Sequence, residues 1–302
     1  MADEQIADNV LDLIGRTPLV RLRKIAPDGL ELLGKLEAQN PAGSVKDRTA
    51  LSMVLAAERD GRLTRDATLV EATSGNTGIS LAMIAAVRGY RCVLVMPEDM
   101  SLERRYMLRA YGAEIVLTNA TDGMQGAVER ALQLLEQTPG AIMLRQFENP
   151  ANPQVHAETT GREILEQTGG KLDAFVTGVG TGGTLTGVGR VLKAALPKVR
   201  IVAVEPAGSP VLSGGAPGLH GIQGLGAGFV PKVLDRSVID SVITVNDLAA
   251  DRMVQRLAQE EGLLLGPSSG ANVHAAMEYG RTLPRGSRVV TVLCDSGERY
   301  LF

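Results

Sequence analysis

The stretch "DAFVTGVGTGGTLTGVGRVL" (residues 173–192) joins an apolar run to a helical pattern through a glycine-rich turn. The turn has the spacing Gly178-x-Gly180-x-x-Gly183, which is typical of loops that bring backbone N–H groups against a phosphate at a helix start. A second apolar run, "RIVAVE", ends on Glu205, near the distance where a dinucleotide site has its ribose-binding acid. The stretch therefore predicts a phosphate site on an α/β fold and leaves the ligand open.

The composition of the chain is that of an ordinary globular protein, with 302 residues of which 44% are apolar and 22% charged. The net charge of −3, with scattered lysines and arginines, predicts no nucleic-acid partner. An acidic opening segment and the lack of any long apolar run lead us to expect a cytoplasmic protein with no membrane segment. Cys92 and Cys294 lie in separate apolar runs and the histidines are dispersed, so we expect two buried free thiols and no metal site.

Short β-rich runs alternate with amphipathic segments along most of the chain. This alternation predicts an α/β fold of βαβ units, with mostly parallel sheets covered by helices on both faces. The expected strands are "TLVEA", "RCVLVM", "AEIVLT", "AIMLRQ", "DAFVTG", "RIVAVE", "SVITV", "GLLLG" and "RVVTVLC". The segment "NPANP" (residues 149–153) resembles a domain boundary before a helix that begins near Val155. We therefore expect two sheets with a ligand cleft between them, beyond the carboxyl ends of the strands.

The loop "NPAGSVKDR" (residues 40–48) follows an apolar run and opens a helix. Ser44 is expected to cap this helix, with Asp47 in the capping-box position. Lys46 then lies in the first helical turn, where the positive end of the helix disfavours a second positive charge. A lysine pushed toward its neutral form suits Schiff-base chemistry or proton abstraction, and the alternative is a solvated helix start.

The loop "EATSGNTGIS" (residues 71–80) also leads from a strand into a helix. Its backbone N–H groups, with the hydroxyls of Thr73, Ser74 and Thr77, can form a cradle for a small anion such as a carboxylate. Asn76 adds an amide that can donate a hydrogen bond to an oxygen on a neighbouring ring. A capped turn without a ligand is the alternative.

Two further observations concern hydroxyl groups at helix starts. In "GPSSGAN" (residues 266–272), Ser268 or Ser269 taken alone is expected to cap the following helix. In the glycine-rich turn, Thr181 and Thr184 are extra donors, which favour a terminal phosphate monoester over a bridging pyrophosphate. The Gly- and Pro-rich stretch 205–231 is too long for an ordinary connection and is expected to be a mobile or site-forming loop.

Together these loops resemble those of the cysteine synthase family, the O-acetylserine sulfhydrylases. That family belongs to the tryptophan synthase β-like, fold type II enzymes that use pyridoxal 5′-phosphate (PLP). The resemblance covers nearly the whole chain, with "GRTPLVRL", "NPAGSVKDR", "EATSGNTGISLAMIAA", "QFENPANP", "GVGTGGTLTGVGR", "IQGLGAGFVP" and "EEGLLLGPSSGA" in family order. It implies two three-layer αβα domains, a smaller and mobile one of residues 41–149 and a larger one of residues 1–40 plus 150–302, with the active-site cleft between them.

The resemblance also implies a role for each candidate site residue. Lys46 would form the internal aldimine with PLP, Asn76 would hydrogen-bond the ring oxygen, and Ser268 would face the pyridine nitrogen. The residues implied to hold the 5′-phosphate are Gly180, Thr181, Gly182, Gly183 and Thr184. The residues implied to bind the substrate are Thr73, Ser74, Gly75, Thr77 and Gln146 around its α-carboxylate, with Gly224 and Gly228 near its leaving group.

The implied reaction is a β-replacement that makes L-cysteine from O-acetyl-L-serine and sulfide and releases acetate, with Lys46 removing and returning the α-proton. An O-phosphoserine sulfhydrylase and a compact cystathionine β-synthase using homocysteine are close alternatives, because Gly221 stands where a basic residue is common in the family. A nicotinamide oxidoreductase and a scaffold that binds a partner's C-terminal carboxylate are more distant alternatives. The family further implies a homodimer and a possible complex with the C-terminal peptide of a serine acetyltransferase.

Overall fold

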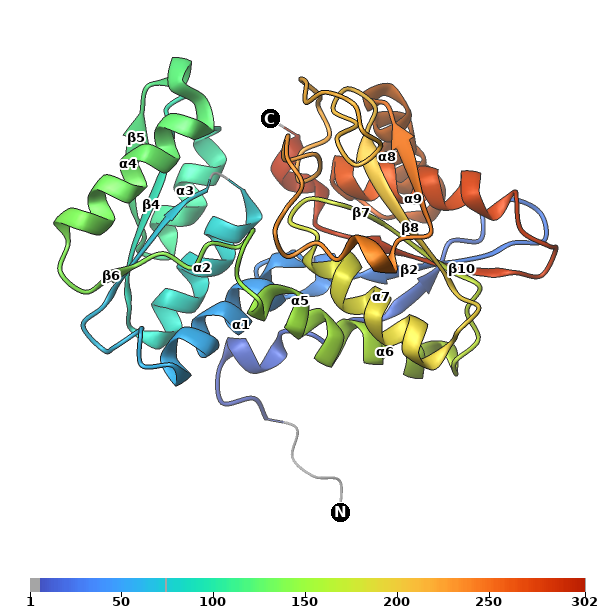
Figure 1. Ribbon diagram of the computed structural model, residues 1–302, viewed down its shortest axis with the longest axis horizontal. Coiled ribbons are helices and arrows are strands. Elements are labelled where there is room, and N and C mark those ends of the chain that lie inside the picture. The colour runs from blue at the N-terminus through green and yellow to red at the C-terminus, as the bar shows by residue number, and fades with distance from the viewer. Residues whose placement is uncertain (1–5, 74, 302) are drawn as a thin grey trace. The chain divides into compact units, whose positions relative to one another are not determined.

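The computed structural model describes residues 6–73 and 75–301, which form two compact units (Figure 1). The first unit contains residues 6–15 and 40–149, and the second contains residues 16–39 and 150–301. Residues 6–15 belong with the first unit, because Leu11 is buried and the N–H of Gly15 donates to Asn40 Oδ1 at 2.8 Å. The sequence had assigned this segment to the larger domain, and the domain bounds as a whole stay a prediction.

The first unit is built on a parallel four-stranded sheet with the strand order β5-β4-β3-β6. Its strands are β3 (Thr68–Ala72), β4 (Arg91–Pro97), β5 (Glu114–Thr118) and β6 (Ala141–Ile142). Its helices are η1 (Val10–Leu13), α1 (Lys46–Arg59), α2 (Asn76–Arg88), α3 (Leu102–Ala110), η3 (Ala120–Asp122) and α4 (Gly123–Gln137). Ala127 and Ala131 of α4 pack with Val70, Val93 and Val95 on one face of the sheet. Helix α2 contacts β4 and packs against α1.

The second unit is built on a six-stranded sheet with the order β1-β2-β10-β7-β8-β9, parallel except for the β1–β2 pair. Its strands are β1 (Leu19–Arg21), β2 (Glu31–Leu36), β7 (Ala174–Gly178), β8 (Arg200–Pro206), β9 (Ser241–Val245) and β10 (Arg288–Leu293). Its helices are η2 (Glu37–Gln39), α5 (Ala151–Val155), the π-helix η4 (His156–Thr160), α6 (Gly161–Thr168), α7 (Gly183–Ala195), η5 (Arg236–Val238), α8 (Asp247–Glu261), α9 (Pro267–Gly280) and η6 (Gly297–Tyr300).

Two apolar cores cover the two faces of this larger sheet. Met253 of α8 and Val273 of α9 lie in one core, and Ile164 of α6 and Leu185 of α7 lie in the other. Neighbouring strand residues alternate between the cores, as Phe175 and Val176 show. A sheet buried on both faces explains why its strands read as nearly continuous apolar runs, and the predicted α/β class with mostly parallel sheets is confirmed.

Three details of the predicted secondary structure are wrong. The run "AIMLRQ" is a strand only over Ala141–Ile142, because the pairing with β3 stops there and the N–H groups of Leu144 and Arg145 bond to the Glu71 carboxylate. The run "GLLLG" makes only an isolated bridge, between Leu265 and Ser296. The helix expected near Val155 begins at Ala151 and includes a π-helical turn, which periodicity alone does not predict.

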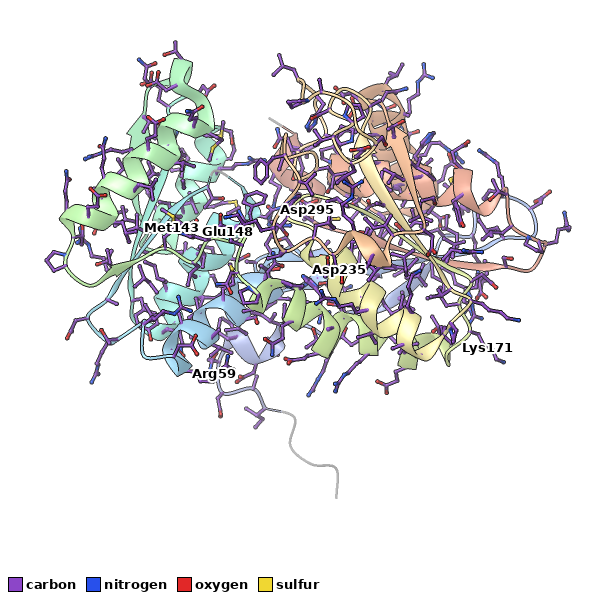
Figure 2. All side chains as sticks on the ribbon, in the orientation of Figure 1. Arg59, Met143, Glu148, Lys171, Asp235 and Asp295 are labelled. Atoms are coloured by element: carbon purple, nitrogen blue, oxygen red, sulfur yellow. The ribbon has the colours of Figure 1, made fainter. Side chains whose placement is uncertain are left out.

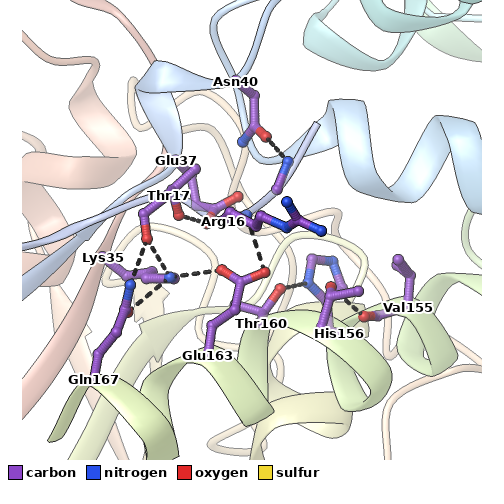
Figure 3. A network of polar contacts seen from close by, with 12 residues as sticks. Arg16, Thr17, Lys35, Glu37, Asn40, Val155, His156, Thr160, Glu163 and Gln167 are labelled. Atoms are coloured by element: carbon purple, nitrogen blue, oxygen red, sulfur yellow. Dashed lines mark hydrogen bonds and ion pairs between the residues drawn. The ribbon is translucent and has the colours of Figure 1, made fainter. Parts of the chain in front are cut away.

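A buried lysine joins β2 to α6 in the second unit (Figure 3). The side chain of Lys35 is fully buried, and its Nζ lies 2.7 Å from Glu163 Oε2 and 2.9 Å from Gln167 Oε1. The ammonium also donates to the carbonyl oxygen of Thr17, and Glu163 accepts the N–H of Arg16. A buried ammonium is tolerated because each of its three donors has an oxygen partner.

Glu71 on β3 is a buried ionisable residue of the first unit, with 7% of its surface exposed. Burial raises its pKa to about 7, against the lowering effect of the N–H groups of Arg145 and Leu144 and of the Arg145 charge. The folded protein therefore binds a proton at Glu71 more tightly than the unfolded chain does, and its stabilising contribution is greatest at low pH.

We expect Glu163→Gln to lower the free energy of unfolding by about 3 kcal/mol, because it removes the carboxylate charge 2.7 Å from the buried Lys35 ammonium. The double variant Lys35→Met/Glu163→Leu should lose less, since it removes both charges. Urea denaturation of the two variants measures this difference. Equal losses in the single and double variants would contradict a charge-based cost.

The raised pKa of Glu71 also predicts a pH dependence of stability. Its contribution is fully present below the unfolded pKa, near 4.5, and is lost as the pH rises through about 7. Glu71→Gln cannot titrate, so its stability relative to the unmodified protein should rise by about 2 kcal/mol between about pH 5.5 and pH 8. Urea denaturation of both proteins at several pH values tests this, and parallel profiles would rule it out.

Candidate functional site

Lys46 is the first residue of α1, as the sequence predicted. The predicted capping box is wrong in its hydrogen bonds: Ser44 Oγ accepts the N–H of Lys46 at 3.2 Å, and Asp47 Oδ2 accepts the N–H of Ala42 at 2.6 Å. The helix begins one residue later than the box requires, with Val45 at the N-cap and no side-chain cap bond. Asp47 therefore fixes the preceding loop rather than the helix end.

Asp47 also connects the first turns of α1 and α2. Its carboxylate is fully buried, and Oδ1 accepts the hydroxyl hydrogen bond of Ser80. The Ser80 hydroxyl lies 3.0 Å from the backbone oxygen of Asn76, the first residue of α2. Lys46 and Asn76 thus stand at two helix starts that one buried Asp–Ser pair holds together. Sequence reasoning treated Asp47 only as a cap, although its place beside a candidate catalytic lysine was a usable signal.

The loop after β3 brings several predicted substrate residues together. The Thr73 hydroxyl accepts the N–H of Gly75 at 3.4 Å, and the Thr77 hydroxyl donates to Gln146 Oε1 at 2.7 Å. Gly75 is the N-cap of α2 and makes no side-chain cap bond. The hydroxyls therefore do not simply cap the helix, and Gln146 joins the loop from 69 residues away. Ser74 lies outside the described residues.

The glycine-rich turn of the second unit has steric reasons for its glycines. Gly182, the N-cap of α7, has a φ of +84°, which favours glycine. A Cβ on Gly180 would lie 2.1 Å from the oxygen of Gly224, and one on Gly183 would lie 1.9 Å from Asn152 Oδ1. The backbone is therefore packed closely around the start of α7, where first-turn N–H groups have no helical partner and favour an anion.

The two threonines of this turn are held by side chains that sequence reasoning did not single out. Asn152 Nδ2 donates to Thr181 Oγ1 at 2.9 Å, and His156 Nε2 lies 3.3 Å from Thr184 Oγ1. His156 Nδ1 in turn lies 3.0 Å from the hydroxyl of Thr160 on the π-helix. The turn thus combines a helix start, close-packed glycines and two fixed hydroxyls, and this donor set fits a phosphate monoester.

Glu205 does not have the role that a dinucleotide site would require. The residue is 2% exposed, its Oε2 accepts the N–H of Leu212 at 2.7 Å, and its Oε1 accepts the N–H of Ser213 at 2.9 Å. The hydroxyl of Ser213 donates to the same Oε1. The carboxylate is therefore occupied by the loop that follows β8, and the oxidoreductase alternative loses its second element.

Ser268 lies in the first turn of α9 and is 5% exposed. The predicted capping role is wrong for both serines, because α9 has no side-chain cap bond and Ser269 Oγ instead accepts the N–H of Cys294 at 2.8 Å. A Cβ on Gly224 would lie 3.9 Å from Ser268 Oγ. Since Gly224 also touches Gly180, these three predicted residues are neighbours.

Gly228 and Asn272 complete the description of this side of the second unit. Gly228 has a φ of +81° and lies near Pro217 in the Gly- and Pro-rich loop. Asn272 Oδ1 accepts the N–H of Gly178 at 2.7 Å, and its Nδ2 donates to the oxygen of Val292 at 2.8 Å. Asn272 thus joins the end of β7 to β10, a role that its place in "GPSSGAN" did not reveal.

Several other sequence expectations concern the chain as a whole. Cys92 is buried and burial raises its pKa to about 12, whereas Cys294 is only half-buried, which corrects the expectation of two buried thiols. Within residues 6–73 and 75–301, no cluster of His, Cys, Asp and Glu is arranged to hold a metal ion. Among the described helices, none has the length and apolar character needed to cross a membrane.

Comparisons with known proteins agree over nearly the full length. The chain is 54% identical over 296 residues to a cysteine synthase of Staphylococcus aureus, covering 97% of this chain and 95% of the relative. A cysteine synthase structure from Entamoeba histolytica superposes with a TM-score of 0.96 at 40% identity, covering 100% of this chain and 91% of that one. An O-ureido-L-serine synthase structure superposes with a TM-score of 0.95 at 50% identity, covering 98% of this chain and 94% of that one.

The family model of the pyridoxal-phosphate dependent enzymes matches residues 10–295. This span contains the lysine at the start of α1, the loop after β3, and the phosphate-type cradle at the start of α7. The fold type II architecture of the cysteine synthase structures is also that of this chain. The chain therefore belongs to the family of pyridoxal-phosphate dependent enzymes.

Proposed function

We propose that this protein is a cysteine synthase that makes L-cysteine from O-acetyl-L-serine and sulfide and releases acetate. The observation that carries the proposal is that a helix-start lysine, a carboxylate-type cradle and a phosphate-type cradle occur together in one chain of this family. The 54% identity to a cysteine synthase supports the choice of substrate.

The cofactor supplies an electron sink for the charge that develops at the α-carbon of the substrate. In the proposal, the residues that would hold it are Lys46, Asn76, Gly180, Thr181, Gly182, Gly183, Thr184 and Ser268. The hydroxyl of Ser268 is neutral, so it would not hold the pyridine nitrogen protonated as a carboxylate would. This arrangement favours loss of a β-substituent over a long-lived carbanion.

Lys46 is proposed as the general base and acid of the reaction. Its amine would take the α-proton of the substrate and later return it to the same carbon. The loop that contains Lys46 is fixed by the buried carboxylate of Asp47, so the amine starts from an ordered helix end. A base that is already oriented lowers the entropic cost of reaching the geometry for proton transfer.

The α-carboxylate of the substrate is proposed to bind at the loop after β3. The residues assigned to it are Thr73, Ser74, Gly75, Thr77 and Gln146. Gly75 and Thr77 stand at the start of α2, where the helix dipole favours a negative charge, and Gln146 reaches this point through its hydrogen bond with Thr77. Gly224 and Gly228 are proposed to lie near the leaving group, where close backbone approach limits its size.

A second candidate function differs only in the nucleophile. The neighbour named O-ureido-L-serine synthase has a product that carries a ureido-oxy group on the β-carbon, where cysteine carries sulfur. The same elimination step followed by attack of hydroxyurea would give that product. The high structural similarity favours testing this nucleophile beside sulfide and homocysteine.

The remaining family expectations belong to the same proposal. A homodimer, a complex with a serine acetyltransferase C-terminal peptide and a cytoplasmic location all stay predictions. None of them is needed for the chemistry at Lys46.

Replacing Lys46 separates cofactor binding from catalysis. Lys46→Ala should lower kcat for cysteine formation by at least about a thousandfold, because it removes the proposed base. It should still retain PLP through the phosphate cradle, which phosphate analysis after gel filtration measures. Turnover close to that of the unmodified protein would place the base on another residue.

The donor and nucleophile preferences are tested with a panel. O-Acetylserine, O-phosphoserine and serine are each combined with sulfide, homocysteine and hydroxyurea, and the amino-acid product is quantified by mass spectrometry. The proposal expects O-acetylserine with sulfide to exceed every other pair in kcat/KM by at least about tenfold, a difference in transition-state binding of about 1.4 kcal/mol. A comparable value with homocysteine or hydroxyurea would assign the protein to that other reaction.

A further inference from the structure

The turn that presents Gln146 is held by a residue of another strand. Figure 2 labels Met143 and Glu148, which flank this turn. Strand β6 pairs with β3 only through Ala141 and Ile142, and the ladder then stops. Beyond it, Glu71 Oε2 accepts the N–H of Leu144 at 3.0 Å and that of Arg145 at 3.2 Å. The carboxylate therefore replaces the strand pairing that ends at Ile142.

The turn needs such support because its backbone is in an unfavourable conformation. Arg145 has a φ of +55°, in the left-handed region that residues with a Cβ rarely adopt. From the other side, the N–H groups of Glu148 and Asn149 both donate to the oxygen of Arg145 at 3.0 Å. Asn149 Nδ2 also donates to the oxygen of Leu144 at 2.8 Å. The hydrogen bonds on both sides together keep Arg145 in this conformation.

The residue that leaves this turn is Gln146, whose Oε1 accepts the hydroxyl hydrogen bond of Thr77 at 2.7 Å. Glu71 belongs to the strand that runs directly into the Thr73 loop, so β3 determines both halves of the contact. Thr77 follows β3 in the chain, and Gln146 follows the turn that the Glu71 side chain of β3 holds. Without this acceptor, the buried N–H of Leu144 and the part-buried N–H of Arg145 would both lose their partner.

We propose that Glu71 is a positioning residue for the substrate's α-carboxylate site, acting through the Leu144–Arg145 turn on the contact between Gln146 and Thr77. This role rests on the proposed function, because it assumes that Gln146 and Thr77 bind an amino-acid substrate. Glu71 is buried and acts through the turn, so its effect is on the geometry of the substrate site. The base, Lys46, lies on a different element and keeps its own supports.

The test compares two substitutions at Glu71. Glu71→Ala removes the acceptor, and we expect it to raise KM for O-acetylserine by at least about tenfold while kcat changes by less than about threefold. Glu71→Gln keeps an oxygen acceptor on a side chain of the same length, so its KM should stay within about threefold of that of the unmodified protein. A merely structural role would lower stability without separating KM from kcat.

A matched control removes a different carboxylate that accepts a backbone N–H. Asp240 Oδ2 accepts the N–H of Ile201 at 2.7 Å, and Oδ1 pairs with Lys193 at 2.9 Å, and neither partner is a candidate site residue. Asp240→Ala should lower the free energy of unfolding and leave KM unchanged. A rise in KM equal to that of Glu71→Ala would overturn the specific role of Glu71.

Amide hydrogen exchange gives a readout that does not depend on turnover. In a peptide covering residues 143–149, Glu71→Ala should exchange at least about tenfold faster than the unmodified protein. Glu71→Gln and Asp240→Ala should leave this exchange unchanged. If the unmodified protein makes no cysteine while this pattern holds, the proposed function fails and the support of the turn by Glu71 stands.

Further variants cover the remaining outcomes. Adding Arg145→Gly to Glu71→Ala should lower KM part of the way back to that of the unmodified protein, because glycine adopts a positive φ without the steric cost. If Glu71→Ala does not fold, Glu71→Asp is measured instead. Its side chain is one methylene shorter, so the carboxylate no longer reaches the turn and KM should also rise. An unchanged KM in the folded Ala or Asp variant, a Gln variant as impaired as the Ala variant, or no recovery with glycine would overturn the proposal.

Discussion

Backbone N–H groups in irregular segments of this protein donate to buried carboxylates at three places. Glu71 accepts two successive N–H groups after β6, Glu205 accepts two after β8, and Asp47 accepts one before α1. All three acids are buried. Loops that carry ligand-binding groups cannot extend a strand or a helix, so another part of the fold must bind their polar groups. Short acidic side chains make that possible while leaving the loops close-packed.

In the phosphate-type cradle the backbone is packed through the lack of side chains at its glycines, and not through added side-chain hydrogen bonds. At Gly180 and Gly183 there is no room for a Cβ, because the backbone of Gly224 and the side chain of Asn152 are already there. The acidic side chains hold some segments by hydrogen bonds to their backbone N–H groups, whereas the glycines allow the backbones of other segments to pack in direct contact. Both devices keep N–H groups ordered before a ligand arrives, which lowers the entropy lost on binding.

Much of the architecture followed from the sequence. Periodicity predicted the α/β class and most strands, because short-range patterns reflect which residues face a core. The order of the loop motifs along the chain indicated the PLP-dependent family. The bonding of Glu71 to residues 144 and 145 was not predictable, since its partners lie 73 and 74 residues away and backbone N–H groups leave no sequence signature. Glu205 looked like a ribose ligand although its partners lie only 7 and 8 residues away, because these partners too are backbone N–H groups. The capping box failed because Ala42, outside the pattern, took the Asp47 carboxylate. At the candidate site, the roles of the Thr73 and Gly180 loops stay predictions from the sequence, and the sequence did not point to Asn152, His156 and Asn272, which bond to residues of other segments.

The attachment of the Gly- and Pro-rich loop has a consequence for how such proteins diversify. Glu205 fixes the loop at Leu212 and Ser213, and the loop is fixed again where Gly221 donates to Asp247 and Gly226 donates to Val179. Between these attachments, residues 213–219 are exposed, and the side chain of Leu219 is entirely so. Exposed segments of this kind, fixed at both ends, are places where insertions are tolerated. Extra residues at the exposed tip of the loop should therefore cost little in loop entropy and leave the strands of the second unit intact.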